Sequence, residues 1–191
     1  SQNFTTATDS FNTAVGYDAG QAVTTGVQNT LLGGLAGDAL TDADYNVAIG
    51  YGALSADTLG SRSVAVGRTA LAAQNFTTAT AAYNTAVGYS AGESVTTGID
   101  NTLVGANAGD ALTVGNNNVA LGRSALTTDT KGDRAVAIGN YALNAQNFTT
   151  TTDNYNVAVG YSAGLAVTTG SGHTLIGGLA GDALTTGNDN V

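Results

Sequence analysis

The chain has 191 residues, of which 10% are charged, and its formal net charge is −9. It has no Cys, which excludes disulfides, thiolate metal sites and thiol chemistry. Only five Lys and Arg residues are present, which argues against nucleic acid as a partner, and no apolar run approaches the ~18 residues of a membrane span. We therefore expect no nucleic-acid partner, no membrane contact within this segment and no cofactor.

A short apolar segment that ends in Gly, as in NTAVG, NVAIG and NTLVG, recurs ten times along the chain. Every fourth repeat is longer than the others, so four repeats make a super-repeat, and QNFTT recurs once in each super-repeat. We therefore predict a single repeat domain over residues 1–191, with super-repeats at 1–72, 73–144 and 145–191, the last one truncated. The recurring glycine is position 0 of its repeat below. The ten position-0 residues are Gly16, Gly33, Gly50, Gly67, Gly88, Gly105, Gly122, Gly139, Gly160 and Gly177.

Each repeat is expected to form a short strand just before its position-0 glycine. Position −1 is always Val, Leu or Ile and position −3 is always Thr or Val, and residues two apart share one face of a strand. Because one repeat is too short for a crossover with a helix, we predict an all-β fold, a parallel β-solenoid of about ten 17-residue coils. We expect position −1 to form the core of the roll. The predicted core residues are Val15, Leu32, Ile49, Val66, Val87, Val104, Leu121, Ile138, Val159 and Ile176.

Position −2 points to the opposite face and is always Ala or Leu. A strand face in contact with water is normally polar, so this second apolar face needs a cover, and one coil is too short to supply it. We therefore expect copies of the chain to associate around a common axis, with position −2 at the interface. The predicted trimer-interface residues are Ala14, Leu31, Ala48, Ala65, Ala86, Leu103, Ala120, Ala137, Ala158 and Leu175.

Three further positions predict local structure. Position +4 alternates in pairs between Gly and Leu, which predicts two kinds of turn. Position −4 is mostly Asn, which favours a ladder of side-chain hydrogen bonds along the stack. The extra residues of every fourth repeat fall around 74–83 and 146–155, and we expect them to bulge outward as a longer loop.

The segments NVAIG, SVAVG and AVAIG, each followed by a turn of small residues, resemble the head repeat of trimeric autotransporter adhesins, the YadA-like NSVAIG type. The resemblance covers essentially the whole chain. It implies a left-handed parallel β-roll assembled as a homotrimer, and a structural or adhesive fibre segment at the cell surface or outside the cell, with an unidentified host receptor or glycan as partner. The NTAVGY form is similar to repeats of bacteriophage tail fibres, so the shaft of a virion tail fibre is the alternative.

A solenoid module that binds carbohydrate or ice is a second alternative. Ice binding needs a regular exposed Thr array, but Thr occupies position −3 in only half of the repeats and on the face predicted to be the core. The seven Tyr residues at positions +1 and −5 are the type that stacks on sugars, although packing between coils or chains is their commoner use. The five cations lie near Asp57, Asp129 and Asp133, and we expect them to neutralise acidic neighbours within or between chains.

Several site-like patterns have plainer interpretations, and we predict no enzyme. GYSAG around Ser90 and Ser162 matches a nucleophile elbow, but Asp18 occupies that place in the first super-repeat, so we predict a turn. His173, the single histidine, stands where the ladder has Asn; we expect it to replace that Asn, although a trimer would bring three copies near an axis. Asp38, Asp110 and Asp182 recur in GDAL and are expected to be solvated turn residues rather than calcium ligands.

The sequence N-F-T begins at Asn3, Asn75 and Asn147, and it makes these three residues candidate glycosylation sites in the longer loops. The alternative is an exposed loop whose Phe packs down onto the roll.

Overall fold

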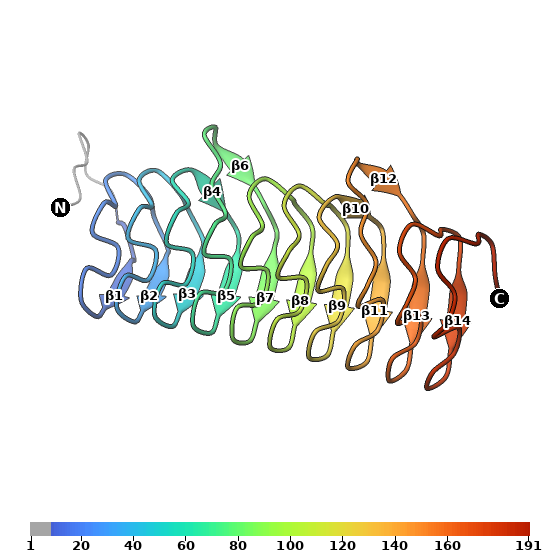
Figure 1. The fold of residues 1–191 in the computed structure, drawn as a ribbon. Helices are drawn as coiled ribbons and strands as arrows, with labels where there is room; N and C mark the ends of the chain where they lie inside the picture. Colours follow the sequence, from blue (N-terminus) through green and yellow to red (C-terminus); the bar gives the residue numbers. More distant parts are fainter. Residues whose placement is uncertain (1–8) are drawn as a thin grey trace.

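The computed structural model describes residues 9–191, which form a stack of parallel coils (Figure 1). Ten three-residue strands, one per coil, form a single parallel sheet along the stack, and the described residues contain no helix. This confirms the prediction of an all-β parallel solenoid with about ten turns, each one repeat long. The strands of this sheet are β1 (Thr13–Val15), β2 (Thr30–Leu32), β3 (Val47–Ile49), β5 (Val64–Val66), β7 (Thr85–Val87), β8 (Thr102–Val104), β9 (Val119–Leu121), β11 (Val136–Ile138), β13 (Val157–Val159) and β14 (Thr174–Ile176).

The register places the same repeat position of successive coils side by side. Val47 of β3 pairs with Val64 of β5, and the next residues follow in step. Backbone hydrogen bonds run from coil to coil, as from the Thr30 amide to the Asn46 carbonyl at 2.8 Å. Each repeat position therefore forms a ladder along the rod, with a spacing of about 4.8 Å.

The position-0 glycine is required because two coils meet there. All ten of these glycines have φ between 127° and 145°, a region that side chains disfavour. In addition, a Cβ atom on Gly50 would collide with the backbone carbonyl of Gly67 in the next coil. Only glycine combines this backbone conformation with this close approach.

The two faces of the strands are reversed relative to the sequence prediction. Position −2 points into the roll: Ala48 and Leu103 are 0% exposed, and Ala14 in the first coil is the single exposed member of this ladder. Position −1 lies on the outside, where Leu32 is 46% and Ile176 is 70% exposed. The residues predicted at a trimer interface but buried inside their own chain are Leu31, Ala48, Ala65, Ala86, Leu103, Ala120, Ala137, Ala158 and Leu175. The residues predicted in the core but placed on the outer face are Val15, Leu32, Ile49, Val66, Val87, Val104, Leu121, Ile138, Val159 and Ile176.

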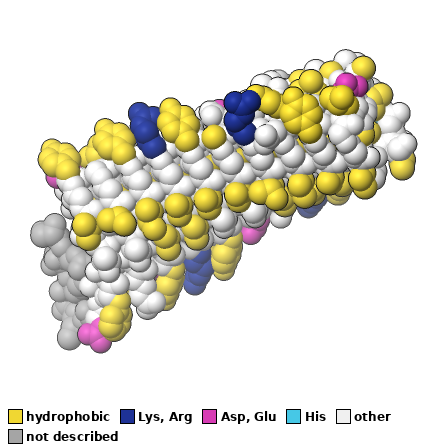
Figure 2. Space-filling model, turned by 90° about the horizontal axis from the view of Figure 1, so that it is seen from below, with side chains coloured by type: hydrophobic (Ala, Val, Ile, Leu, Met, Phe, Trp, Pro, Cys, Tyr) yellow, Lys and Arg dark blue, Asp and Glu magenta, His cyan; other side chains and the backbone are white. Residues whose placement is uncertain are grey.

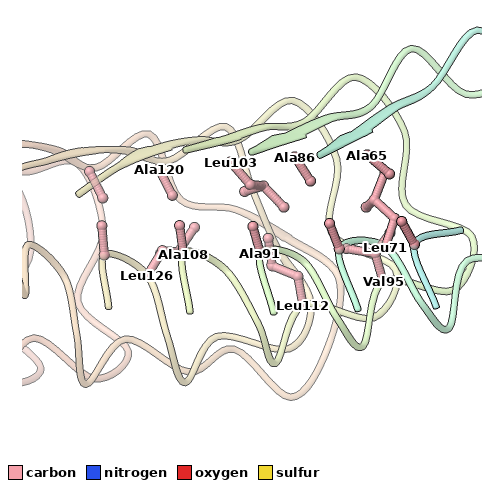
Figure 3. Close-up of a cluster of buried hydrophobic side chains, with 14 of the residues drawn as sticks. Ala65, Leu71, Ala86, Ala91, Val95, Leu103, Ala108, Leu112, Ala120 and Leu126 are labelled. Carbon is pink, nitrogen blue, oxygen red and sulfur yellow. The ribbon is translucent and has the colours of Figure 1, made fainter. Parts of the chain in front are cut away.

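The physical reason for the reversal is the narrow interior of the coil. Figure 3 shows position −2 residues such as Ala86 and Leu103 pointing toward Ala91 and Ala108 of position +3 across the interior. These alanines are completely buried, so strand and turn approach closely. A Val or Ile at every position −2 would overfill this space.

Position +4 has one backbone conformation rather than the two predicted. Leu54 (φ 53°) and Leu71 (φ 50°) have the same left-handed conformation as Gly20 (φ 62°). The choice of residue follows the interior volume instead. A Cβ atom on Gly37 would lie 2.8 Å from a methyl group of Leu31, so Leu at position −2 requires Gly at +4, whereas Leu54 lies in a coil with Ala at −2.

The extra residues of the longer repeats bulge from the rod, as predicted (Figure 1). At the first bulge, β4 (Gly60–Ser61) pairs in parallel with β6 (Thr80–Ala81). At the second, β10 (Gly132–Asp133) pairs in parallel with β12 (Thr152–Asp153). Phe76 and Phe148 at the bases of these bulges are each only 6% exposed. The interpretation that this Phe packs down onto the roll is therefore confirmed for both.

The Asn ladder of position −4 is confirmed. Asn29 Oδ1 accepts from the Asn46 amide of the next coil at 2.9 Å, and Asn46 Nδ2 donates to the Gly60 carbonyl at 2.9 Å. Both side chains are completely buried. The ladder thus supplies hydrogen-bond partners for backbone amides and carbonyls inside the coil that are not paired within the sheet.

Candidate interaction surface

The outer face of the ten-stranded sheet runs along all ten coils and contains no charged residue. Positions −3 and −1 project from it and consist only of Thr, Val, Leu and Ile. Its side chains are half-buried or exposed, with Val15 at 56% and Leu121 at 44%. Figure 2 shows a row of hydrophobic side chains running along the rod on this side. We refer to positions −3 and −1 together as the outer sheet face.

Larger side chains line both edges of the outer sheet face, at positions −5 and +1 (Figure 2). These two edge ladders contain seven of the eight Tyr residues and all four Arg residues. The −5 ladder is Phe11, Gln28, Tyr45, Arg62, Tyr83, Asp100, Asn117, Arg134, Tyr155 and Gly172. The +1 ladder is Tyr17, Gly34, Tyr51, Arg68, Tyr89, Ala106, Arg123, Asn140, Tyr161 and Gly178.

The arginines of the edge ladders stack on tyrosine rings of neighbouring coils. The Arg62 guanidinium lies 5.2 Å from the ring centroid of Tyr45 and 5.8 Å from that of Tyr83. Arg68 lies in the same way between Tyr51 and Tyr89, at 6.0 and 5.6 Å. These distances permit cation–π attraction and confirm that tyrosines pack across coils.

Across the described residues, no cation forms an ion pair with Asp57, Asp129 or Asp133, so their predicted neutralisation within one chain is wrong, whereas neutralisation of acidic neighbours between chains stays a prediction. Among residues 9–191 the single ion pair joins Arg134 to Asp153, and this carboxylate raises the pKa of Arg134. Asp57 and Asp129 are buried instead, and each accepts a 2.6 Å hydrogen bond from a buried glutamine, Gln74 or Gln146. Position +7 is therefore polar in four coils, at Asp57, Gln74, Asp129 and Gln146, where the other coils have Val or Leu.

The GYSAG segments form turns. Ser90 follows β7 with φ of 51°, is 2% exposed, and its hydroxyl lies 3.0 Å from the Thr69 hydroxyl. Ser162 occupies the corresponding turn after β13 and is 3% exposed. A nucleophile elbow needs a helix after the serine, and these serines are followed by further turn residues.

His173 replaces Asn in the ladder, as predicted. It is completely buried, its amide donates to Asn156 Oδ1 at 3.0 Å, and its Nδ1 lies 3.3 Å from the Asn190 amide. Its Nε2 has no hydrogen-bond partner. No group of three or more His, Cys, Asp or Glu residues lies close enough to hold a metal within the described part of the chain.

The recurring GDAL aspartates differ in their surroundings. Asp182 is exposed, whereas Asp38 and Asp110 are half-buried, each with one carboxylate oxygen lacking a partner. Asp110 accepts from Asn107 Nδ2 at 3.1 Å, but Leu35 stands in the corresponding place near Asp38. Burial raises the pKa of Asp38, and the negative charge of Asp18 adds to this.

Two of the candidate glycosylation sites are accessible. Asn75 and Asn147 are exposed, and Asn3 lies outside the described residues. Asn75 Oδ1 accepts from the Thr58 hydroxyl at 3.1 Å. It thereby continues a ladder at position +8 that sequence reasoning missed, in which Thr41 donates to the Thr58 carbonyl at 3.0 Å. The recurrence of Thr at +8 in eight repeats is the signal that identifies this ladder.

By its fold, the chain belongs to the parallel β-solenoids. Comparison with protein-family models, curated proteins and solved structures gave no match. Among the described residues, no helix has the length and apolar character needed to cross a membrane.

Proposed function

We propose that the chain is a rod-forming segment of an extracellular adhesive fibre, in which three copies associate through their outer sheet faces. The observation that supports this proposal is the outer sheet face itself. It is uncharged and continuous over ten strands. A sheet face in contact with water normally has polar side chains, so a long apolar face is typical of a surface that a partner covers.

Because the strands are reversed, the proposed interface lies on the other strand face, and that face still has apolar side chains to cover. Position −2 fills the interior of each chain, so the residues left to cover are those of positions −3 and −1. Cyclic association around an axis parallel to the rod brings one such face from each copy to the centre. The number three comes from the resemblance of the repeats to trimeric adhesin heads.

The adhesive role is assigned to the side of the rod away from the outer sheet face. The bulges at β4–β6 and β10–β12 expose Thr77, Thr78 and Thr150, and the sequence QNFTT that forms them recurs once in each super-repeat. Repeated copies of a weak binding site on one rigid rod gain avidity. The shaft of a phage tail fibre uses the same architecture with a virion as its base.

Sedimentation of the purified chain tests the association. We expect a trimer, and we expect Ile49→Lys to lower the association constant at least about tenfold, because it places a charge on the outer sheet face. Thr97→Lys is the matched control, since Thr97 is exposed away from this face and should leave the trimer intact. A stable monomer at micromolar concentration would overturn the proposal.

A second candidate, an ice-binding solenoid, has one observation in its favour. The Thr side chains of position −3 lie on the outer sheet face and are accessible, not in the core. Thermal hysteresis of the wild-type chain measures this activity directly. The proposal of a fibre segment predicts none, because its partner copies cover the same face.

A further inference from the structure

The two edge ladders have residues of the same kind at six of the ten levels of the rod, whereas the coils of β2 (Gln28 and Gly34) and β8 (Asp100 and Ala106) hold unlike residues. Both members are aromatic in the coils of β1, β3, β7 and β13, and both are Gly in the coil of β14. Both are Arg in the coil of β5, at Arg62 and Arg68, and the coils of β9 and β11 each combine one Asn with one Arg. The super-repeat makes coils alike along the rod, but it does not require the two edges of one coil to agree.

The edge ladders have the composition of a protein interface. Tyr and Arg are the residues most enriched at the centres of protein–protein contacts, whereas Lys and Glu are depleted there. Neither ladder contains Lys or Glu, and Asp100 is the single acidic residue in the two ladders. The tyrosines remain largely accessible in the single chain, with Tyr51 at 55% and Tyr83 at 55%, so their rings are available to another copy.

We infer that copies of the chain pack parallel and in register, with the −5 ladder of one copy against the +1 ladder of the next at the same coil. This inference rests on the proposed side-by-side association and adds its orientation and contacts. Rotation about an axis parallel to the rod brings opposite edges together without an axial shift. Tyr45 then meets Tyr51 of the neighbour, and aromatic pairs cover the apolar centre from water at four levels.

The alternative arrangements fit the ladders less well. Antiparallel packing sets the −5 ladder against itself in reverse order, so that Phe11 meets Gly172 and Gln28 meets Tyr155. An axial shift of one coil is a screw operation that does not close into a ring, and it places Tyr45 opposite Gly34 or Arg68. In-register packing is least favourable at the coil of β5, because Arg62 of one copy meets Arg68 of the next and their positive charges repel. The Tyr rings in the coils on either side of each guanidinium offset this repulsion.

Cross-linking between two differently labelled chains tests the register. The chain has no Cys, so engineered cysteines react without background. Chains with Tyr45→Cys are co-assembled with chains that have Gly34→Cys, Tyr51→Cys or Arg68→Cys, and a short bismaleimide is added. All these positions are on the surface, so the fold tolerates the changes. On denaturing gels, we expect the mixture of Tyr45→Cys and Tyr51→Cys chains to give at least about three times more cross-linked product than the mixtures with Gly34→Cys or Arg68→Cys.

A fourth mixture, Tyr45→Cys with Arg134→Cys, reports antiparallel packing, because these residues lie on the same edge at opposite levels. Three outcomes would overturn the inference while leaving association intact. They are a dominant product in this fourth mixture, a highest yield with Gly34→Cys or Arg68→Cys, and equal yields in all mixtures. Sedimentation of each mixture before cross-linking separates this failure from failure of the proposed function. Monomers throughout would overturn both.

Discussion

Single residues in this protein adopt the backbone conformation that the stack imposes on their position. Positions −5, +2 and +4 are left-handed throughout, including residues as unsuited to it as Leu54, Thr69 and Tyr141. Outside glycine this conformation costs about 1–2 kcal/mol per residue. The coil-to-coil hydrogen bonds on both sides of each residue hold it there, so the conformation belongs to the repeat position rather than to the residue.

Two glycines of one coil should therefore respond very differently to the same change. Gly50→Ala places a methyl group against the Gly67 carbonyl, and we expect a loss of at least about 3 kcal/mol of unfolding free energy. Gly52→Ala adds its methyl group where the nearest atom is 3.7 Å away, and other coils tolerate Asp, Leu or Ser there, so about 1 kcal/mol should be lost. Urea unfolding followed by circular dichroism compares the two. Equal losses would show that close approach of the coils does not select the glycine.

Asp38 should make stability depend on pH. Its raised pKa means that folding disfavours the charged carboxylate, so the cost is absent below the ordinary pKa of 3.8 and appears as pH rises through the folded-state pKa. We expect Asp38→Asn to melt at a higher temperature than wild type at pH 7, and the difference to vanish below pH 4.

Asp110→Asn is the control for this comparison, since that carboxylate accepts from Asn107 and should gain nothing when it is replaced. A gain at Asp38 that persisted unchanged to pH 3 would mean that the carboxylate charge is not its cause.

At the scale of the coil, the interior is a set of ladders whose volumes compensate one another. A Leu at −2 goes with Gly at +4, and Ala at −2 goes with Leu at +4 in the coils of β3 and β5. Where both are small, as at Ala86 and Gly92, side chains of Leu71 and Leu103 from the adjoining coils fill the gap. Packing is therefore shared between adjacent coils, which is why the sequence repeats over four coils and not over one.

The buried polar network at position +7 should be essential. Asp57 accepts from the amides of Gly60 and Phe76 at 3.0 and 3.1 Å and from Gln74 at 2.6 Å, all in a completely buried place. Asp57→Ala leaves the buried amides of Gly60 and Phe76 without an acceptor and removes one of the two acceptors of Gln74 Nε2, the other being the Ser63 hydroxyl. We expect a loss of about 3–5 kcal/mol in urea unfolding.

Asp129→Ala should reproduce this loss, because Asp129 accepts from the equivalent residues one super-repeat further on, Gly132, Phe148 and Gln146. Asp42→Ala, at an exposed side chain, should change stability by less than about 0.5 kcal/mol. A small effect at Asp57 would mean that water replaces the carboxylate in this network.

The fold could be predicted from the sequence because periodicity identifies strand positions and ladders directly. Periodicity also shows that Leu103 and Val104 point to opposite faces, but it does not show which face is inside. That choice depends on the width of the coil, which only Ala and occasional Leu fit, and β-branched residues were wrongly assigned to the core. The Asp57–Gln74 pair was missed because each residue alone looks like a surface residue, and their burial follows from stacking.

The whole molecule is a linear stack of coils, and its backbone, its interior and its sides differ in whether the single chain itself pairs or covers their groups. Backbone groups are paired along the axis by the ten-stranded sheet, and the interior is closed by the coil itself. The sides differ: one is apolar between two ladders of Tyr and Arg (Figure 2), and another has the Thr ladder of position +8 and the two bulges (Figure 1). The side-by-side association that we propose therefore uses a face that the fold does not need for its own stability, so the proposal makes single-chain folding and assembly separable.

This separation predicts how salt acts on assembly. The outer sheet face contains no charge, so its apolar contacts are insensitive to moderate salt, but each copy has a net charge of −9 and copies repel one another. Screening extends over about 10 Å at 0.1 M salt, which is the scale of neighbouring rods. We expect sedimentation at 300 mM NaCl to give a higher association constant than at 20 mM. The melting temperature of the Ile49→Lys chain should change far less over the same range. Association that weakened with salt would instead mean that ion pairs, and not the outer sheet face, hold the copies together.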